Sequence, residues 1–200
     1  MTGASRTDAG VHAMRQTVSL RTTSSLPPSA VLGALNAALP VDIRLIEAHE
    51  ASPEFHARFG ARGKRYLYLI DNGRVASPLI RRFAWHVPAP LDVGRMRAGL
   101  ALLRGHHDFS SFRAAAGQDR TPLCTVRALH VRKRAGRVAI IVSADRFLHH
   151  MVRTIVGSAV EIGRGAREPA WLAHVLAGRD RRLAGMTAPA HGLTLVRVVY

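Results

Sequence analysis

Residues 125–144 restrict the fold more than any other stretch of this chain, because they read as two paired strands. Val, Leu and Ile alternate with polar residues over 125–134 and over 137–144, and Ala135 and Gly136 separate the two runs. Alternation with a period of two is typical of a half-buried strand, and a two-residue break containing glycine favours a tight turn. The sequence therefore predicts an antiparallel hairpin and a sheet built around it.

Further strands and helices are predicted on both sides of this hairpin. On residues 64–70, Lys64, Tyr66 and Tyr68 share one strand face, and the turn at 71–73 ends the run. Shorter alternating stretches predict strands at 16–21, 42–49, 81–86 and 193–200. Apolar residues at helical spacing predict helices at 30–38, 92–104, 147–162 and 168–177, with Ser29 and Asp92 as N-caps of the first two. Strand, helix and strand recur in each half of the chain, which favours an α+β fold whose two halves share one sheet.

The charge of the chain indicates the kind of partner. Lys and Arg number 29 against 13 Asp and Glu, which gives a net charge of +16. An excess of this size favours a polyanionic partner, most simply a nucleic acid. A compositional bias towards arginine is the alternative, since Lys64 and Lys133 are the only lysines.

Cysteine usage and hydropathy exclude several classes of protein. Cys124 is the single cysteine, so an internal disulfide framework and a cysteine-based zinc site are excluded, and a reducing cytoplasm is expected. The role of Cys124 itself stays open. No run of about 18 apolar residues is present, so no membrane span is expected. No P-loop or dinucleotide fingerprint occurs, and we expect no small-molecule cofactor.

The segment from Arg6 to His12 is the first candidate for chemistry. It places an arginine, a carboxylate, a glycine and a histidine within seven positions, with Asp8 next to the small residues Ala9 and Gly10. Small neighbours let a backbone turn sharply and let a ligand approach the acid closely. An ordinary polar turn, with Asp8 capping a nearby amide, is the alternative.

Several further positions each have more than one possible role. Arg153 lies within an apolar helix, where an arginine either extends to solvent or pairs with a buried carboxylate. Tyr66 either packs or stacks on a base. His149 and His150 could cap a helix, pack, or contact a phosphate; adjacent histidines on a helix do not share a face, so no metal is expected. The loop at 106–113, with His106, His107 and Asp108, suits phosphate contacts better than a metal.

The chain resembles a known family in seven blocks that occur in the family's order. They are residues 6–13, 36–40 with 42–43, 55–59, 64–66, 107–113, 147–153 and 192–195. Together they resemble the TruA-type tRNA pseudouridine synthases over essentially all 200 residues. The resemblance implies the pseudouridine synthase fold, with two similar α+β halves sharing a mostly antiparallel mixed sheet flanked by helices.

The resemblance also implies roles for particular residues. Asp8 would be the nucleophile that attacks a uridine at C1′ of the sugar or C6 of the base. Arg153 would keep that carboxylate charged when RNA expels water. Tyr66 would stack on the target base and help to remove the C5 proton, and Leu193 would line the pocket floor. Substrate binding would further involve Arg6, Arg58 and His150.

Partners and organisation follow from the same resemblance. It implies an isomerase, without metal or cofactor, that acts as a homodimer on uridines 38, 39 and 40 in the anticodon arm of tRNA. We expect an N-terminal half at 1–56, a connecting strand and loop at 57–91, and a C-terminal half at 92–200. Because the chain opens directly on the first block, we also expect that an N-terminal segment of the family is missing. A catalytically impaired RNA-binding fragment is therefore the alternative function.

Overall fold

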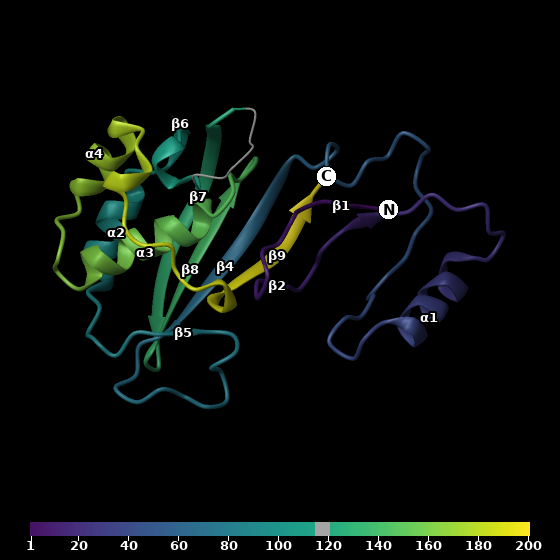
Figure 1. Cartoon of the computed structure of the whole chain (residues 1–200), viewed down its shortest axis with the longest axis horizontal. Coiled ribbons are helices and arrows are strands. Elements are labelled where there is room, and N and C mark those ends of the chain that lie inside the picture. The colour runs from purple at the N-terminus through teal and green to yellow at the C-terminus, as the bar shows by residue number, and fades with distance from the viewer. Residues whose placement is uncertain (115–120) are drawn as a thin grey trace.

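A computed structural model describes residues 1–114 and 121–200 of the chain (Figure 1). The strands are β1 (Thr2–Gly3), β2 (His12–Ala13), β3 (Val18–Ser19), β4 (Gly63–Asp71), β5 (Trp85–His86), β6 (Gly105–Asp108), β7 (Leu123–Arg134), β8 (Arg137–Ala144) and β9 (Leu193–Val199). The α-helices are α1 (Pro28–Ala38), α2 (Val93–Ala101), α3 (Met151–Gly163) and α4 (Trp171–Gly178). Short 3₁₀ turns cover Ser110–Phe112, Arg181–Leu183 and Ala190–Gly192.

Seven of the strands form one mixed sheet in the order β2-β9-β4-β8-β7-β6, with β5 paired to β4. The pairs β2–β9 and β4–β5 are parallel, and the other pairs of this sheet are antiparallel. Strands β1 and β3 form a separate antiparallel pair. The predicted fold class, an α+β chain with a mostly antiparallel mixed sheet, is confirmed.

The hairpin predicted at 125–144 is the two-strand unit β7–β8. Ala135 and Gly136 connect the strands with φ values of 47° and 70°, and Arg134 pairs with Arg137. Positive φ at both central residues matches the right-handed twist of the flanking strands, which is why such turns close two-residue hairpins. Lys64 to Asp71 of β4 then pair with β8, so this hairpin forms the middle of the sheet.

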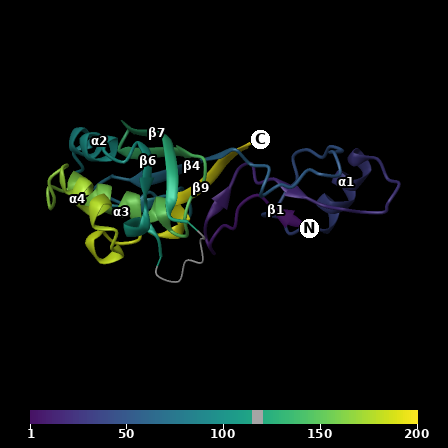
Figure 2. The same cartoon turned by 90° about the horizontal axis from the view of Figure 1, so that it is seen from above.

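The helices divide into two groups in space. Helices α2, α3 and α4 lie together beside the β6–β8 end of the sheet, whereas α1 lies far from them at the opposite end (Figures 1 and 2). Helix α3 supplies much of the core: Met151, Ile155, Ala159 and Ile162 are all fully buried, as their spacing predicts. Asp92 caps α2 as predicted, since its carboxylate accepts a hydrogen bond from the amide of Arg95 at 2.9 Å.

The N-terminal region differs most from the prediction. The strand predicted at 42–49 is absent, because no neighbouring strand in the described part of the chain pairs with it. The side chain of Asn36 instead makes both hydrogen bonds to the backbone of Leu45. Helix α1 is preceded by Pro27 rather than capped by Ser29, and none of its residues is buried. The apolar stripe predicted on this helix is therefore only partly covered, with Leu35 exposed.

Several predicted boundaries were also wrong. The strands predicted at 16–21 and 81–86 shrink to Val18–Ser19 and Trp85–His86. The loop predicted at 106–113 is strand β6 followed by a 3₁₀ turn. Helix α3 begins at Met151 and not at Phe147.

The proposed division of the chain at residues 56 and 91 stays a prediction. No helix within residues 1–114 and 121–200 has the length and hydrophobicity needed to cross a membrane.

Candidate active site

A cavity of about 620 Å³ lies where the N-terminal loop meets β4, β9 and the start of α3. Its lining includes every residue predicted for the site: Arg6, Asp8, Arg58, Tyr66, His150, Arg153 and Leu193. These positions span almost the whole sequence. The fold therefore brings together residues that the sequence separates by as many as 187 positions, from Arg6 to Leu193.

The loop that carries Asp8 is fixed by side chains outside it. Gln16 accepts a hydrogen bond from the amide of Ser5 and donates one to its carbonyl, at 3.2 and 2.8 Å. Gly10 adopts a φ of 81°, a left-handed conformation that glycine adopts without strain, and Val11 donates to the carbonyl of Asp8. The carboxylate of Asp8 is consequently held in the cavity wall with its side chain 26% exposed.

Arg153 is the cation that faces this carboxylate. Its Nη1 donates to Oδ2 of Asp8 at 2.8 Å, and its Nε donates to the carbonyl of Ala188 at 2.8 Å. Its side chain is only 15% exposed. Of the two readings for an arginine inside an apolar helix, the buried carboxylate partner is therefore the one that the structure has.

Tyr66 lies on the same side of the site as the Asp8 loop. Its hydroxyl shares a hydrogen bond of 2.8 Å with the hydroxyl of Ser5, and its ring makes an edge contact with Phe147 at 5.1 Å. Burial, with a smaller contribution from the charge of Asp8, raises the pKa of the Tyr66 phenol, and the hydrogen bond from Ser5 only partly opposes this. The phenol is therefore neutral at pH 7 in this structure.

The apolar part of the cavity comes from β9 and the chain before α3. Leu193 opens β9 and is 6% exposed, and the adjacent Gly192 packs against the ring of Tyr68. Tyr68 is fully buried and donates its hydroxyl to the carbonyl of Pro189, so it packs rather than lining the cavity. A flat base would thus meet an apolar surface from Tyr66, Phe147 and Leu193.

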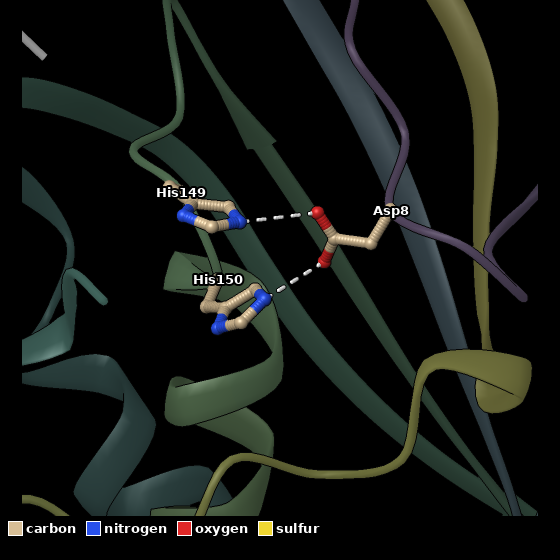
Figure 3. Close-up of side chains that lie close together, drawn as sticks. All are labelled: Asp8, His149 and His150. Carbon is tan, nitrogen blue, oxygen red and sulfur yellow. Dashed lines mark ion pairs between the residues drawn. The ribbon is translucent and has the colours of Figure 1, made fainter. Parts of the chain in front are cut away.

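His149 and His150 both face the carboxylate of Asp8. Nε2 of His149 is 3.3 Å from Oδ1 of Asp8, and Nε2 of His150 is 3.2 Å from Oδ2 (Figure 3). Burial lowers the pKa of His150; the charge of Asp8 opposes the shift, while His149 and Arg153 add to it. Sequence reasoning included His150 in the site but not His149.

Lys64 and Arg58 are further cations in the lining of the cavity. Lys64 precedes Tyr66 on the same face of β4, and Arg58 comes from the segment before this strand. Burial and the nearby charges of Arg58 and Arg146 lower the pKa of Lys64. Lys64 was missed as a site residue, although its alternation with Tyr66 on one strand face was a usable signal.

The described residues contain one group whose donors could hold a metal ion together. It is Asp8, His149 and His150, whose ligand atoms all lie within 4.8 Å of one another. The pair His106 and His107 forms no such group: His106 contacts the hydroxyl of Thr125, and His107 contacts the carbonyl of Arg104. The histidine of the first motif, His12, contacts Phe83 and the carbonyl of Arg82 and does not line the cavity.

Comparison with known proteins shows which family the sequence matches. A family model described as tRNA pseudouridine synthase matches residues 1–60 and 100–200. The chain belongs to the tRNA pseudouridine synthase family. Similar members include proteins named tRNA pseudouridine synthase A. That of Methylococcus capsulatus is 47% identical over the whole chain and 74% of its own length, and that of Myxococcus xanthus is 45% identical over 98% of this chain and 75% of its own.

The match to the tRNA pseudouridine synthase family has one gap that matters for the site. The family model covers Asp8, Arg58, His150, Arg153 and Leu193, whereas Tyr66 and Lys64 on β4 fall between its two matched stretches. A third relative of the same name, from Moorella thermoacetica, is 46% identical over 98% of the chain and so extends across this gap.

Proposed function

We propose that this chain isomerises uridine to pseudouridine in tRNA, with Asp8 as the nucleophile. The observation that carries the proposal is the charged contact of 2.8 Å between Arg153 and Asp8 at the wall of a cavity. A carboxylate can attack and also leave, and an adjacent guanidinium keeps it charged as water is displaced. The names of the relatives support tRNA as the substrate.

The chemistry needs only the groups that line this cavity. Asp8 attacks the uridine at C1′ of the sugar or at C6 of the base, and the bond between C1′ and N1 breaks. The uracil rotates, C1′ bonds to C5, and the bond between Asp8 and the substrate breaks to restore the free carboxylate. The C5 proton leaves and N1 gains a proton, so that no atom is added overall. Tyr66 supports this sequence as a flat surface for the base, and Leu193 closes the floor beneath it.

The target base must leave its stem to reach Asp8. Flipping a nucleotide costs a few kcal/mol, which phosphate contacts and stacking offset. Arg6, Arg58 and His150 are proposed as substrate-binding residues, and Lys64 joins them because it lines the same cavity. Among the described residues that line the cavity, the cations outnumber the acid Asp8, so an anionic nucleotide suits it better than a neutral ligand.

We further propose that the substrates are uridines 38, 39 and 40 of the anticodon arm, modified in the cytoplasm by a homodimer. One cavity that serves neighbouring positions would recognise the shape and the backbone of the RNA rather than base edges. The uncovered apolar residues near α1 support a second copy as a neighbour, since Leu20, Leu26, Val41, Ile43 and Ile46 are all exposed.

The test is to incubate the purified chain with an unmodified tRNA transcript and to map pseudouridine by carbodiimide labelling and primer extension. Wild type should modify positions 38–40, and Asp8→Asn, which keeps the shape of the side chain, should reduce modification to background. Arg164→Gln at the far end of α3 is the matched control and should retain activity. If Asp8→Asn modified the arm at the wild-type rate, the assignment of the nucleophile would be wrong.

A companion measurement separates the alternative functions. Filter binding measures the affinity of wild type for the same tRNA. If wild type binds the tRNA but forms pseudouridine only at background, the chain is an RNA-binding protein without turnover. Light scattering of the eluted protein tests the dimer: a mass twice the chain's 21.7 kDa supports it, and the monomer mass contradicts it.

A further inference from the structure

Two neighbouring histidines and a carboxylate converge in the wall of the cavity (Figure 3). Nε2 of His149 lies 3.3 Å from one oxygen of Asp8, and Nε2 of His150 lies 3.2 Å from the other. All three donors lie within 4.8 Å of one another. The isomerisation proposed above does not require these three side chains to act together.

The convergence depends on an unusual backbone conformation. Side chains of consecutive residues point apart on a strand and about 100° apart on a helix. His150 instead adopts a φ of 64°, in the left-handed region, immediately before α3. The two imidazole rings consequently lie side by side, with centroids 4.0 Å apart and an interplanar angle of 42°.

The donor types and spacing suit a transition ion. Imidazole nitrogen and carboxylate oxygen are ligands of zinc, at about 2.0–2.2 Å. Ligands at that distance around a tetrahedral ion lie about 3.3–3.6 Å from each other. The separation from Nε2 of His149 to Oδ1 and that from Nε2 of His150 to Oδ2 are already in or next to this range.

Arg153 affects such a site in two opposite ways. It donates to Oδ2 of Asp8, the oxygen that Nε2 of His150 approaches, whereas Oδ1 faces His149; a hydrogen bond to a ligating carboxylate is its usual support. Its positive charge also repels the ion and weakens binding. The site is therefore expected to bind reversibly rather than to hold a permanent structural metal.

We propose that Asp8, His149 and His150 bind one zinc-class ion, and that the bound ion blocks the carboxylate from acting on RNA. The three protein ligands would leave a fourth position open to water. Mg²⁺ should not replace the ion, because it prefers oxygen ligands to imidazole. The blocking part of the proposal rests on Asp8 being the nucleophile, whereas the binding part does not.

Binding is tested on the untagged protein after treatment with a chelator. Titration with Co²⁺ should give visible absorption that saturates at one ion per chain and that Zn²⁺ removes. His149→Asn, His150→Asn and Asp8→Asn should each weaken Co²⁺ binding at least about tenfold. Asparagine is chosen at position 150 because it tolerates a positive φ better than most residues.

The chain offers a matched control in its second histidine pair. His106→Asn and His107→Asn remove adjacent histidines of β6 that have other partners, and Co²⁺ binding should be unchanged in both. Wild-type protein that fails to bind Co²⁺, or that binds it as well after the ligand substitutions, would overturn the site.

Blocking is tested by pseudouridine formation with added Zn²⁺. Pseudouridine formation by wild type should fall as Zn²⁺ saturates the site and should return when a chelator is added. The same concentration of Mg²⁺ should leave it unchanged. The residual activity of His149→Asn should resist Zn²⁺, which separates binding by the protein from binding by the RNA. Zn²⁺ binding without loss of modification would overturn the blocking role. Co²⁺ binding by a chain that forms no pseudouridine would leave the site standing and contradict the proposed function alone.

Discussion

Asp8 and Arg153 form a pair in which both side chains are largely removed from water, at 26% and 15% exposure. Removing one member of a buried pair leaves the other charge without its partner, which is costly. Arg153 is also tied to the carbonyl of Ala188, so its guanidinium is oriented before any RNA arrives. Its effect should consequently appear in the rate more than in the affinity.

We predict that Arg153→Ala lowers the single-turnover rate of pseudouridine formation by a factor on the order of a hundred or more. The affinity for tRNA should change only slightly, because Arg153 is one cation among many. Rate and affinity are measured on the same preparations by rapid quench and by filter binding. Arg182→Ala, which removes an exposed arginine paired with Asp180, should change neither. Parallel losses of rate and affinity in Arg153→Ala would make Arg153 a phosphate contact.

The hydroxyl pair of Ser5 and Tyr66 allows a second prediction at this scale. Because the two groups share one hydrogen bond, Ser5→Ala and Tyr66→Phe should each lower the free energy of unfolding by about 0.5–1.5 kcal/mol. The double variant should lose less than the sum of the two, as expected of partners in direct contact. Urea denaturation of the four proteins measures this. Additive losses would show that the two hydroxyls do not interact.

The sequence predicted the side chains that line the cavity, but not the residues that hold them in position. Asp8, Arg153, Tyr66 and Leu193 stood out through motifs and through resemblance, and all of them line the cavity. Gln16 and Ala188, which fix the loop and the arginine, gave no signal, because their contacts involve backbone groups that meet only in the folded chain. The metal-ligand geometry of His149 was missed because it depends on the φ angle of His150.

At the scale of elements, strands were predictable where a partner strand exists. The residues of β4, β7 and β8 alternate and pair along their full lengths, and all three were predicted. Residues 42–49 alternate equally well but have no partner in the described part of the chain, so alternation alone did not make a strand. Helix α3 begins late because the left-handed residue His150 interrupts the apolar periodicity that starts at Phe147.

Two glycines inside helices should respond to alanine in opposite directions. A methyl group at Gly157 of α3 would overlap the backbone carbonyl of Met186, whereas one at Gly33 of α1 would meet nothing within 4 Å. Gly157→Ala should therefore destabilise the fold by about 1–3 kcal/mol or more. Gly33→Ala should stabilise it by about 0.5–1 kcal/mol, because alanine loses less conformational entropy in a helix.

Thermal and urea unfolding of both glycine variants measure this difference. Gly157→Ala should also reduce pseudouridine formation, since displacing Met186 moves the nearby Ala188 that holds Arg153. Equal unfolding midpoints for the two variants would show that the contact between α3 and Met186 is not rigid.

At the scale of the whole molecule, the charge of +16 predicts binding that depends steeply on salt. Lys64→Gln and Arg58→Gln should each reduce the slope of log affinity against log salt by about one, if each side chain contacts one phosphate. Filter binding over a range of salt concentrations gives the slope. Arg164→Gln, which removes a cation at the C-terminal end of α3, is the control and should leave it unchanged. Equal slopes for Lys64→Gln and wild type would exclude a phosphate contact at Lys64.

The position of Asp8 in the sequence affects when the cavity can assemble during synthesis of the chain. Strand β2, which follows the loop, pairs only with β9 in the main sheet, and the carboxylate faces Arg153, 145 positions later. Contacts so distant in sequence form only after most of the chain is available. An unfinished polypeptide emerging from a ribosome carries the acid without its arginine, its pocket floor or its neighbouring strand. The cavity that these residues line therefore cannot form until synthesis is almost complete.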